Sequence, residues 1–236
     1  MRRLYLLLLL LLAMVCVSPA FANEADGISS LAVSRCAGRM GLDVREADGA
    51  FGSFALDGIP WTTAEHVEET VGDQAISTTI TGTGLFRRRN GAAVWFRYTC
   101  FLDAKGQALI IHASPLMLHL GDKLPPSTTI SGTAGYRGNS PLPHGIELRL
   151  QLLDIGQEPA EVLAEQVVRS GWQQPIAFAL RLPAATSLQH RKLVIVARLV
   201  LAHRTLFRLV EPYAVPAENI GATVNLILEP LSPSSR

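Results

Sequence analysis

The second half of the chain alternates between apolar and polar side chains. Residues 146–152 carry isoleucine or leucine at every even position and glutamate, arginine or glutamine at every odd position. The same period, or a strand-like apolar run, recurs over 128–136, 162–168, 176–182, 193–201, 204–209 and 223–229. A period of two is typical of strands that bury one face. About seven such strands separated by turns predict an antiparallel β-sandwich.

The first half mixes two periods. Ser30–Met40 predicts a short helix, because apolar residues share one face and Gly41 is a natural stop. Thr62–Val71 is a second helical candidate, because Thr62 and Glu65 have the spacing of a capping box.

Strand-like runs follow these helical candidates. Residues 75–83 are rich in threonine and isoleucine, and Asn90-Gly91 separates the runs 85–89 and 92–98. An Asn-Gly pair between two such runs predicts a tight hairpin. A further run at 108–113 completes an antiparallel meander, so we expect a small α+β domain here.

Glycine, proline and serine concentrate between the two halves, at residues 121–127. This composition indicates a linker, and we place the domain boundary near Pro125. The fold class expected is therefore mainly β: a small α+β domain over 23–120, and a β-sandwich over 126–232.

The N-terminus has the three parts of a secretory signal peptide. Two arginines precede an apolar run over 4–17, and small residues lead to a cleavage site after Ala22. A transmembrane anchor needs about 20 apolar residues, and this run is shorter. A lipid anchor at Cys16 is the other alternative, but bulky Val15 precedes it where a small residue is expected. We therefore expect a periplasmic protein with no transmembrane span after cleavage.

The mature chain keeps two cysteines, Cys36 and Cys100. In an oxidising compartment the simplest interpretation is one disulfide between them, within the first domain. A metal site is the alternative, and no histidines stand near these cysteines at ligand spacing.

Charge and motifs narrow the function. The formal net charge of +1 and the scattered basic residues predict no nucleic-acid partner. The cluster Arg87-Arg88-Arg89 suits either an anionic surface or, more simply, a solvated hairpin tip. Serine-hydrolase, zinc-protease and phosphate-loop motifs are all missing from the sequence, so we expect no catalytic residue, no metal and no cofactor.

Aromatic residues are few, and three tryptophans stand out. Trp61, Trp95 and Trp172 are candidates for a surface that stacks on a ligand, although a place in the core is the alternative for each. Trp172 precedes a predicted strand, where an exposed side chain would suit a binding hot spot. Trp172 and Tyr213 are the residues that we assign to a possible binding surface.

Several segments of the second half resemble the YbaY/YscW family from about Ile130 to Leu231. They are 130–137 (ISGTAGYR), Leu142-Pro143-His144, Leu153-Asp154, 162–166 (VLAEQ), 174–180 (QPIAFAL) and Tyr213-Ala214-Val215. The resemblance implies a β-sandwich in the bacterial envelope. Some members act as pilotins, outer-membrane lipoproteins that chaperone secretin subunits of type III secretion, and others are envelope lipoproteins linked to polysaccharide metabolism. The family offers no catalytic residues to carry over.

The sequence departs from the family pattern in lacking a lipid-attachment motif and in having an extra domain in front. Two hypotheses follow. In the first, the protein is a non-enzymatic assembly factor or chaperone with an envelope protein as partner and possible outer-membrane association. In the second, it binds or processes envelope glycans.

Overall fold

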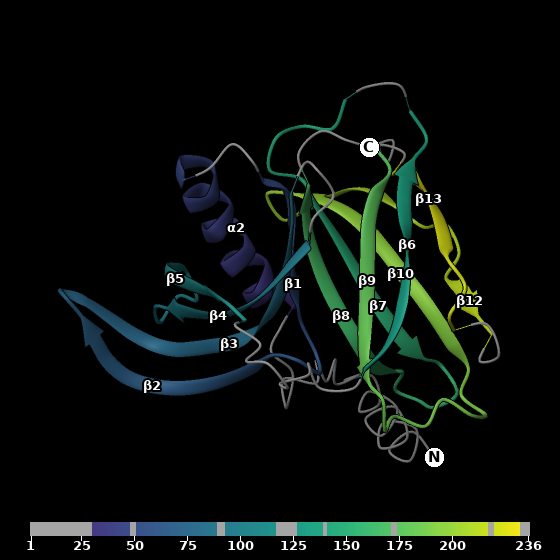
Figure 1. Ribbon diagram of the computed structural model, residues 1–236, viewed down its shortest axis with the longest axis horizontal. Coiled ribbons are helices and arrows are strands. Elements are labelled where there is room, and N and C mark those ends of the chain that lie inside the picture. The colour runs from purple at the N-terminus through teal and green to yellow at the C-terminus, as the bar shows by residue number, and fades with distance from the viewer. Residues whose placement is uncertain are drawn as a thin grey trace, which may run out of the picture.

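The computed structural model describes residues 30–47, 51–88, 93–116, 127–138, 141–170, 174–216 and 220–231 (Figure 1). Five features expected from the sequence lie outside the described residues: the cleavage site after Ala22, Cys16, the Asn90-Gly91 turn, the boundary at Pro125, and Trp172. The described part contains one helix and thirteen strands, which confirms the expected mainly-β class.

The first half contributes the helix and five strands. These elements are α2 (Ser30–Ala47), β1 (Phe51–Asp57), β2 (Thr63–Val71), β3 (Gln74–Arg88), β4 (Ala93–Leu102) and β5 (Ala108–Pro115).

The second half contributes eight strands. They are β6 (Ser127–Tyr136), β7 (Glu147–Asp154), β8 (Glu161–Ser170), β9 (Ile176–Pro183), β10 (Leu193–Leu201), β11 (Arg204–Arg208), β12 (Tyr213–Val215) and β13 (Val224–Pro230).

The strands form one continuous path in the order β5-β4-β3-β1-β8-β7-β10-β11-β13-β6-β9, while β2 also pairs with β3 and β12 with β10. All pairings are antiparallel except that between β13 and β6, which is parallel. The second half was expected to be antiparallel throughout, so this pair is a difference from the prediction. The period of side chains does not encode strand direction, because both arrangements alternate in the same way.

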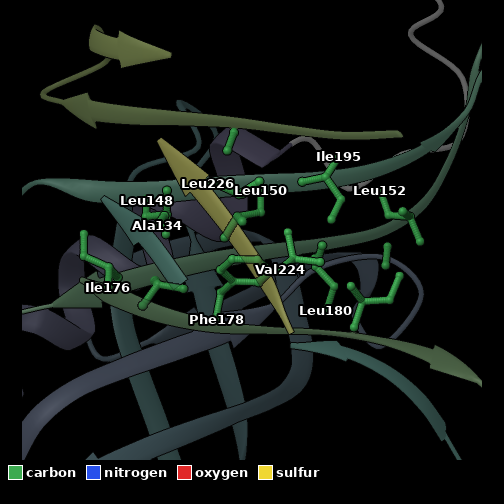
Figure 2. Packing of buried hydrophobic residues seen from close by; sticks show 14 of the residues in the cluster. Ala134, Leu148, Leu150, Leu152, Ile176, Phe178, Leu180, Ile195, Val224 and Leu226 are labelled. Carbon is green, nitrogen blue, oxygen red and sulfur yellow. The ribbon is translucent and has the colours of Figure 1, made fainter. Parts of the chain in front are cut away.

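Figure 2 shows the core of the second half, in which side chains from two layers of strands face one another. Leu148, Leu150 and Leu152 of β7 project from one layer, and Phe178 and Leu180 of β9 project from the other. These five side chains are at most 2% exposed. The even-numbered positions of 146–152 are thus the buried ones, as the alternation predicts.

The parallel pair β6–β13 depends on a glycine. Gly132 of β6 lies opposite Val224 of β13, and a Cβ atom at Gly132 would lie 2.0 Å from the Val224 carbonyl oxygen. A glycine within a strand often marks such a close approach of another backbone.

The core of the first half lies between α2 and the sheet. Val33, Cys36 and Met40 of the helix are at most 2% exposed, and Cys36 forms a disulfide with Cys100 of β4. The predicted covalent link between helix and meander is therefore present. The helix runs past its expected stop at Gly41, where the missing side chain makes room for Arg169 of β8.

The expected helix at Thr62–Val71 is wrong, because these residues form the strand β2. β2 pairs with β3 over most of its length, and the two strands extend together away from the sandwich (Figure 1). The hydroxyl of Thr62 does not cap a helix. It donates a hydrogen bond to the carbonyl oxygen of Asp57, 2.5 Å away.

Candidate functional site

The strand β1 joins the two halves of the chain. One of its edges pairs with β3 of the first half and the other with β8 of the second half. Ala55 packs in the core of the second half, whereas Phe54 and Leu56 pack in the core of the first. The two halves therefore share a strand, a sheet and a boundary between their cores.

A buried ion pair lies at the end of β1. Asp57 is 1% exposed and Arg181 of β9 is 3% exposed, with 3.3 Å between Asp57 Oδ2 and Arg181 Nη1. Thr83 Oγ1 donates a hydrogen bond to Asp57 Oδ2 at 2.8 Å. Gln166 Nε2 donates to Asp57 Oδ1 at 3.1 Å. The carboxylate thus binds partners from both halves, which is the condition under which a buried charge is tolerated.

Two tryptophans enclose the guanidinium of this pair. The Arg181 Cζ atom lies 4.4 Å from the ring centroid of Trp61 and 4.4 Å from that of Trp95. Trp61 Nε1 also donates a hydrogen bond of 2.9 Å to the Arg181 carbonyl oxygen. Stacking of a desolvated cation on an aromatic face is worth about 2 kcal/mol. One face of each of these candidate ligand-stacking side chains therefore lies on Arg181.

The side chain of Gln166 bonds to the backbone of β9 at one residue. Its amide nitrogen donates to the Ala179 carbonyl oxygen at 2.9 Å, and its amide oxygen accepts from the Ala179 nitrogen at 3.0 Å. A primary amide used in this way replaces a residue of a neighbouring strand. An unpaired edge invites pairing with another chain, and Gln166 of β8 occupies that edge of β9 at Ala179.

The enclosed site has a perturbed electrostatic environment. Burial raises the pKa of Asp57, while Thr83 and Arg181 oppose the rise. Burial also raises the pKa of Tyr98, whose hydroxyl lies 3.2 Å from that of Thr62. We call Asp57, Arg181 and the residues bonded to them the joint between the two halves. Because Asp57, Arg181 and Tyr98 are at most 3% exposed, a substrate cannot reach them in the folded protein. Their arrangement holds the two halves together.

A second polar contact fixes α2 to the sandwich. The hydroxyl of Ser34 donates a hydrogen bond to the buried carboxylate of Glu147. Arg149 Nη2 lies 2.6 Å from Ser34 Oγ, and Arg169 Nη2 lies 2.7 Å from Glu147 Oε1. One carboxylate of β7 thus binds the helix and two arginines.

Glu165 of β8 differs from the other buried carboxylates. Gln151 donates to its Oε1 at 2.5 Å, whereas its Oε2 is buried and has no hydrogen-bond partner among the described residues. Burial raises the pKa of Glu165, and the hydrogen bond from Gln151 partly offsets the rise.

Metal ligation finds little support in the described part of the chain. No three histidine, cysteine, aspartate or glutamate side chains there lie close enough to share a metal ion. The described residues likewise include no helix with the length and apolar character needed to span a bilayer.

An unpaired backbone edge is the candidate binding site of the second half. β13 pairs with β11 only through Phe207–Pro230 and Arg208–Glu229. Over Val224–Leu228, the edge of β13 that faces away from β6 has no strand partner among the described residues. Free N–H and C=O groups along such an edge can accept an added strand.

Three exposed apolar side chains lie on β13 itself and on the segment that follows β11. Val210, between β11 and β12, is 64% exposed, Tyr213 of β12 is 39% exposed, and Ile227 of β13 is 55% exposed. Tyr213 pairs with Ile195 of β10, so its backbone is held in the sheet while its ring faces solvent. Val210 and Ile227 did not emerge from the sequence. Ile227 breaks the expected alternation, because it is an apolar residue on the outer face of its strand.

Comparisons with known proteins concern the second half. Residues 125–228 match the family model described as type III secretion system lipoprotein chaperone (YscW). A solved structure described as an alternative pilotin from the type II secretion system of Vibrio cholerae is similar over 46% of this chain and 100% of its own, with 21% identity and a TM-score of 0.42. No curated protein matches the chain. Over residues 125–228, the chain is therefore matched to the family of type III secretion system lipoprotein chaperones.

Proposed function

We propose that this protein is a non-enzymatic, pilotin-like assembly factor of the bacterial envelope, whose second domain binds a segment of a partner protein. The match of residues 125–228 to a family of secretion chaperones supports a protein partner. The single structural observation that carries the proposal is the unpaired edge of β13 over Val224–Leu228.

The proposed mode of binding is strand addition. An extended partner segment would supply main-chain hydrogen bonds to the free edge of β13, and its side chains would contact the apolar residues nearby. Tyr213 and Ile227 are the contacts that we assign, because they are 39% and 55% exposed. Trp172, which lies outside the described residues, is proposed as a further contact on the strength of its position before β9.

We propose a periplasmic location on the basis of the N-terminal sequence and the two cysteines. Export with cleavage after Ala22 would bring the chain into an oxidising periplasm, where the disulfide between Cys36 and Cys100 is expected to persist. We propose that residues 23–120 form the first domain and 126–232 the second, with the partner bound by the second.

Absence of catalysis is part of the proposal. Three of the four buried carboxylates among the described residues bind arginines, in the pairs Asp57–Arg181, Glu147–Arg169 and Asp154–Arg191. The fourth, Glu165, accepts a hydrogen bond from Gln151. Among the described residues these pairs serve the joint and the sheet rather than an open cleft.

Site-specific photo-crosslinking tests the proposal. A photoreactive residue replaces Tyr213 or Ile227 in the full-length protein expressed in cells, and cross-linked products are mapped by mass spectrometry. The control position is Ile110 of β5, which is 37% exposed and belongs to the other half. We expect both test positions, and not Ile110, to cross-link to one contiguous segment of one envelope protein.

The affinity of the protein for a synthetic peptide of that segment is then measured. We expect Tyr213→Ala to weaken its binding about tenfold or more, since truncation of a hot-spot tyrosine costs about 2 kcal/mol or more. Equal cross-linking at Ile110, or peptide affinity that is unchanged in Tyr213→Ala, would overturn the proposed surface.

Glycan binding is the competing function. The three tryptophans are the residues that suggest this function. In the structure Trp61 and Trp95 each stack one face on Arg181, so that face of each ring is already occupied. A glycan array with the mature protein distinguishes the two functions, because the proposed protein-binding role predicts no specific glycan signal.

A further inference from the structure

A pocket opens between α2 and the sheet of the first half. Its volume is about 390 Å³, within the range of about 300–1,000 Å³ that is usual for small-molecule sites. The inner lining is apolar and consists of Met40 of α2, Phe86 of β3, Val94 and Phe96 of β4, and Ile111 and Ala113 of β5.

Packing of α2 against the sheet sets the helix side of the pocket. Cys36 is held to the sheet by its disulfide and is fully buried, and Met40, one turn later, belongs to the same core and lines the pocket. Beyond Met40 the pocket is lined on the helix side by Asp43. Phe86 and Phe96 stack with 4.2 Å between their centroids and form an aromatic wall.

Arg88 is the charged lining residue without an ion pair among the described residues. The formal charges of the lining cancel, since Arg88 and Asp43 are its two charged residues. Arg88 is exposed and belongs to the Arg87-Arg88-Arg89 cluster. The single acidic lining residue, Asp43, is already paired with Arg39, with 3.4 Å between Arg39 Nη2 and Asp43 Oδ1. A ligand with an apolar tail and an anionic end would match both features. An uncharged or cationic amphiphile would match only the first.

We propose that this pocket binds the acyl chain of a medium-chain fatty acid, with its carboxylate at Arg88. At roughly 30 Å³ for each group of the size of a water molecule, the pocket has room for about a dozen methylene-sized groups. This site lies in the first half and is independent of the partner surface at β13. It also gives the arginine cluster a role as an anion contact at a defined place.

Isothermal titration of the mature protein with octanoate, decanoate and dodecanoate, each below its micelle concentration, tests whether the pocket binds the alkyl chain. Each buried methylene contributes about 0.8 kcal/mol, so each two-carbon step should lower the Kd by up to about fifteenfold. Dodecyltrimethylammonium has the same alkyl chain as dodecanoate and the opposite charge, so it tests the contact between the carboxylate and Arg88. It should bind about fivefold more weakly than dodecanoate.

Matched variants locate the site. Ala113→Phe fills the pocket and should abolish dodecanoate binding, whereas His112→Phe, on the neighbouring exposed position of the same strand, should leave it unchanged. Arg88→Glu should weaken binding about fivefold or more, and Arg97→Glu, an exposed position that does not line the pocket, should not.

Folding of each variant is checked by thermal unfolding, and Val94→Phe replaces Ala113→Phe if the latter does not fold. Three results would overturn the proposal: a Kd independent of chain length, dodecanoate binding that survives the filling variant, or binding to phosphatidylglycerol vesicles without binding of monomeric dodecanoate. The last would make the arginine cluster a membrane-surface contact.

Discussion

Replacing Arg181 with methionine should lower the free energy of unfolding by about 3–5 kcal/mol. Methionine is long enough to occupy much of the space between Trp61 and Trp95, so the main loss is the cation. The carboxylate of Asp57, 1% exposed and 3.3 Å from the guanidinium, would then be a buried charge without a counterion.

Three contributions determine the loss in the free energy of unfolding. Removal of one partner from a buried ion pair costs about 3–5 kcal/mol, because the other charge stays desolvated. The two ring contacts at 4.4 Å add a loss, while the hydrogen bonds that Thr83 and Gln166 donate to Asp57 limit it. For a protein of this size, each kcal/mol shifts the Tm by about 2–4 °C, so a decrease of about 6–20 °C is expected.

Urea unfolding followed by tryptophan fluorescence and by far-ultraviolet circular dichroism measures the loss. Arg137→Met is the control, because the pair Arg137–Glu229 is exposed and should contribute less than about 1 kcal/mol. The double variant Asp57→Asn/Arg181→Met should recover part of the loss, since the unpaired charge is removed as well. A loss in Arg181→Met no larger than that in the control would refute the reasoning.

Three further predictions concern stability. The double variant Cys36→Ser/Cys100→Ser should lose about 4 kcal/mol of the free energy of unfolding in urea, because the disulfide closes a long loop. Gly132→Ala should lose about 1–3 kcal/mol through collision with the neighbouring strand, whereas Gly221→Ala, with no atom within 4 Å of its Cβ position, should not; thermal unfolding compares the two. The raised pKa of Glu165 means that the folded protein binds this proton more tightly, so its contribution to stability is present below pH 4.5 and is lost as the pH rises through the folded pKa. Glu165→Gln should therefore stabilise the protein more at about pH 7 than at about pH 4, and an unchanged pH profile of unfolding would contradict this.

The strands of the second half are visible in the sequence because most of them bury one face. In β7 the leucines at 148, 150 and 152 enter the core while Arg149 and Gln151 do not, and this difference in burial is what the alternation records. The disulfide between Cys36 and Cys100 was also predictable, since the first half holds two cysteines and the compartment was inferred from the N-terminus.

β1 and β2 were missed for opposite reasons. β1 is packed on both faces, with Phe54 and Leu56 in one core and Ala55 in the other, so its pattern does not alternate. β2 is exposed at every position but one, so burial leaves no pattern in it, and pairing with β3 decides its conformation.

The joint and the edge of β13 depend on tertiary structure. Arg181 occupies a position that the alternation assigns to the outer face of its strand, and it is buried because the first half covers that face. The order in which the strands pair decides which strand edges stay unpaired, and no local sequence pattern predicts that order. Tyr213 was named from the sequence, whereas Ile227 required the register of β13.

The shared strand has a consequence for biogenesis. Ser53 of β1 pairs with Ser170 of β8, so the nascent polypeptide carries β1 for more than a hundred residues before its second neighbour exists. During that interval the edge of β1 that will pair with β8 has no strand partner and could pair with another extended chain. Because this pairing joins residues more than a hundred positions apart, the entropy of closing that loop favours its formation late in folding.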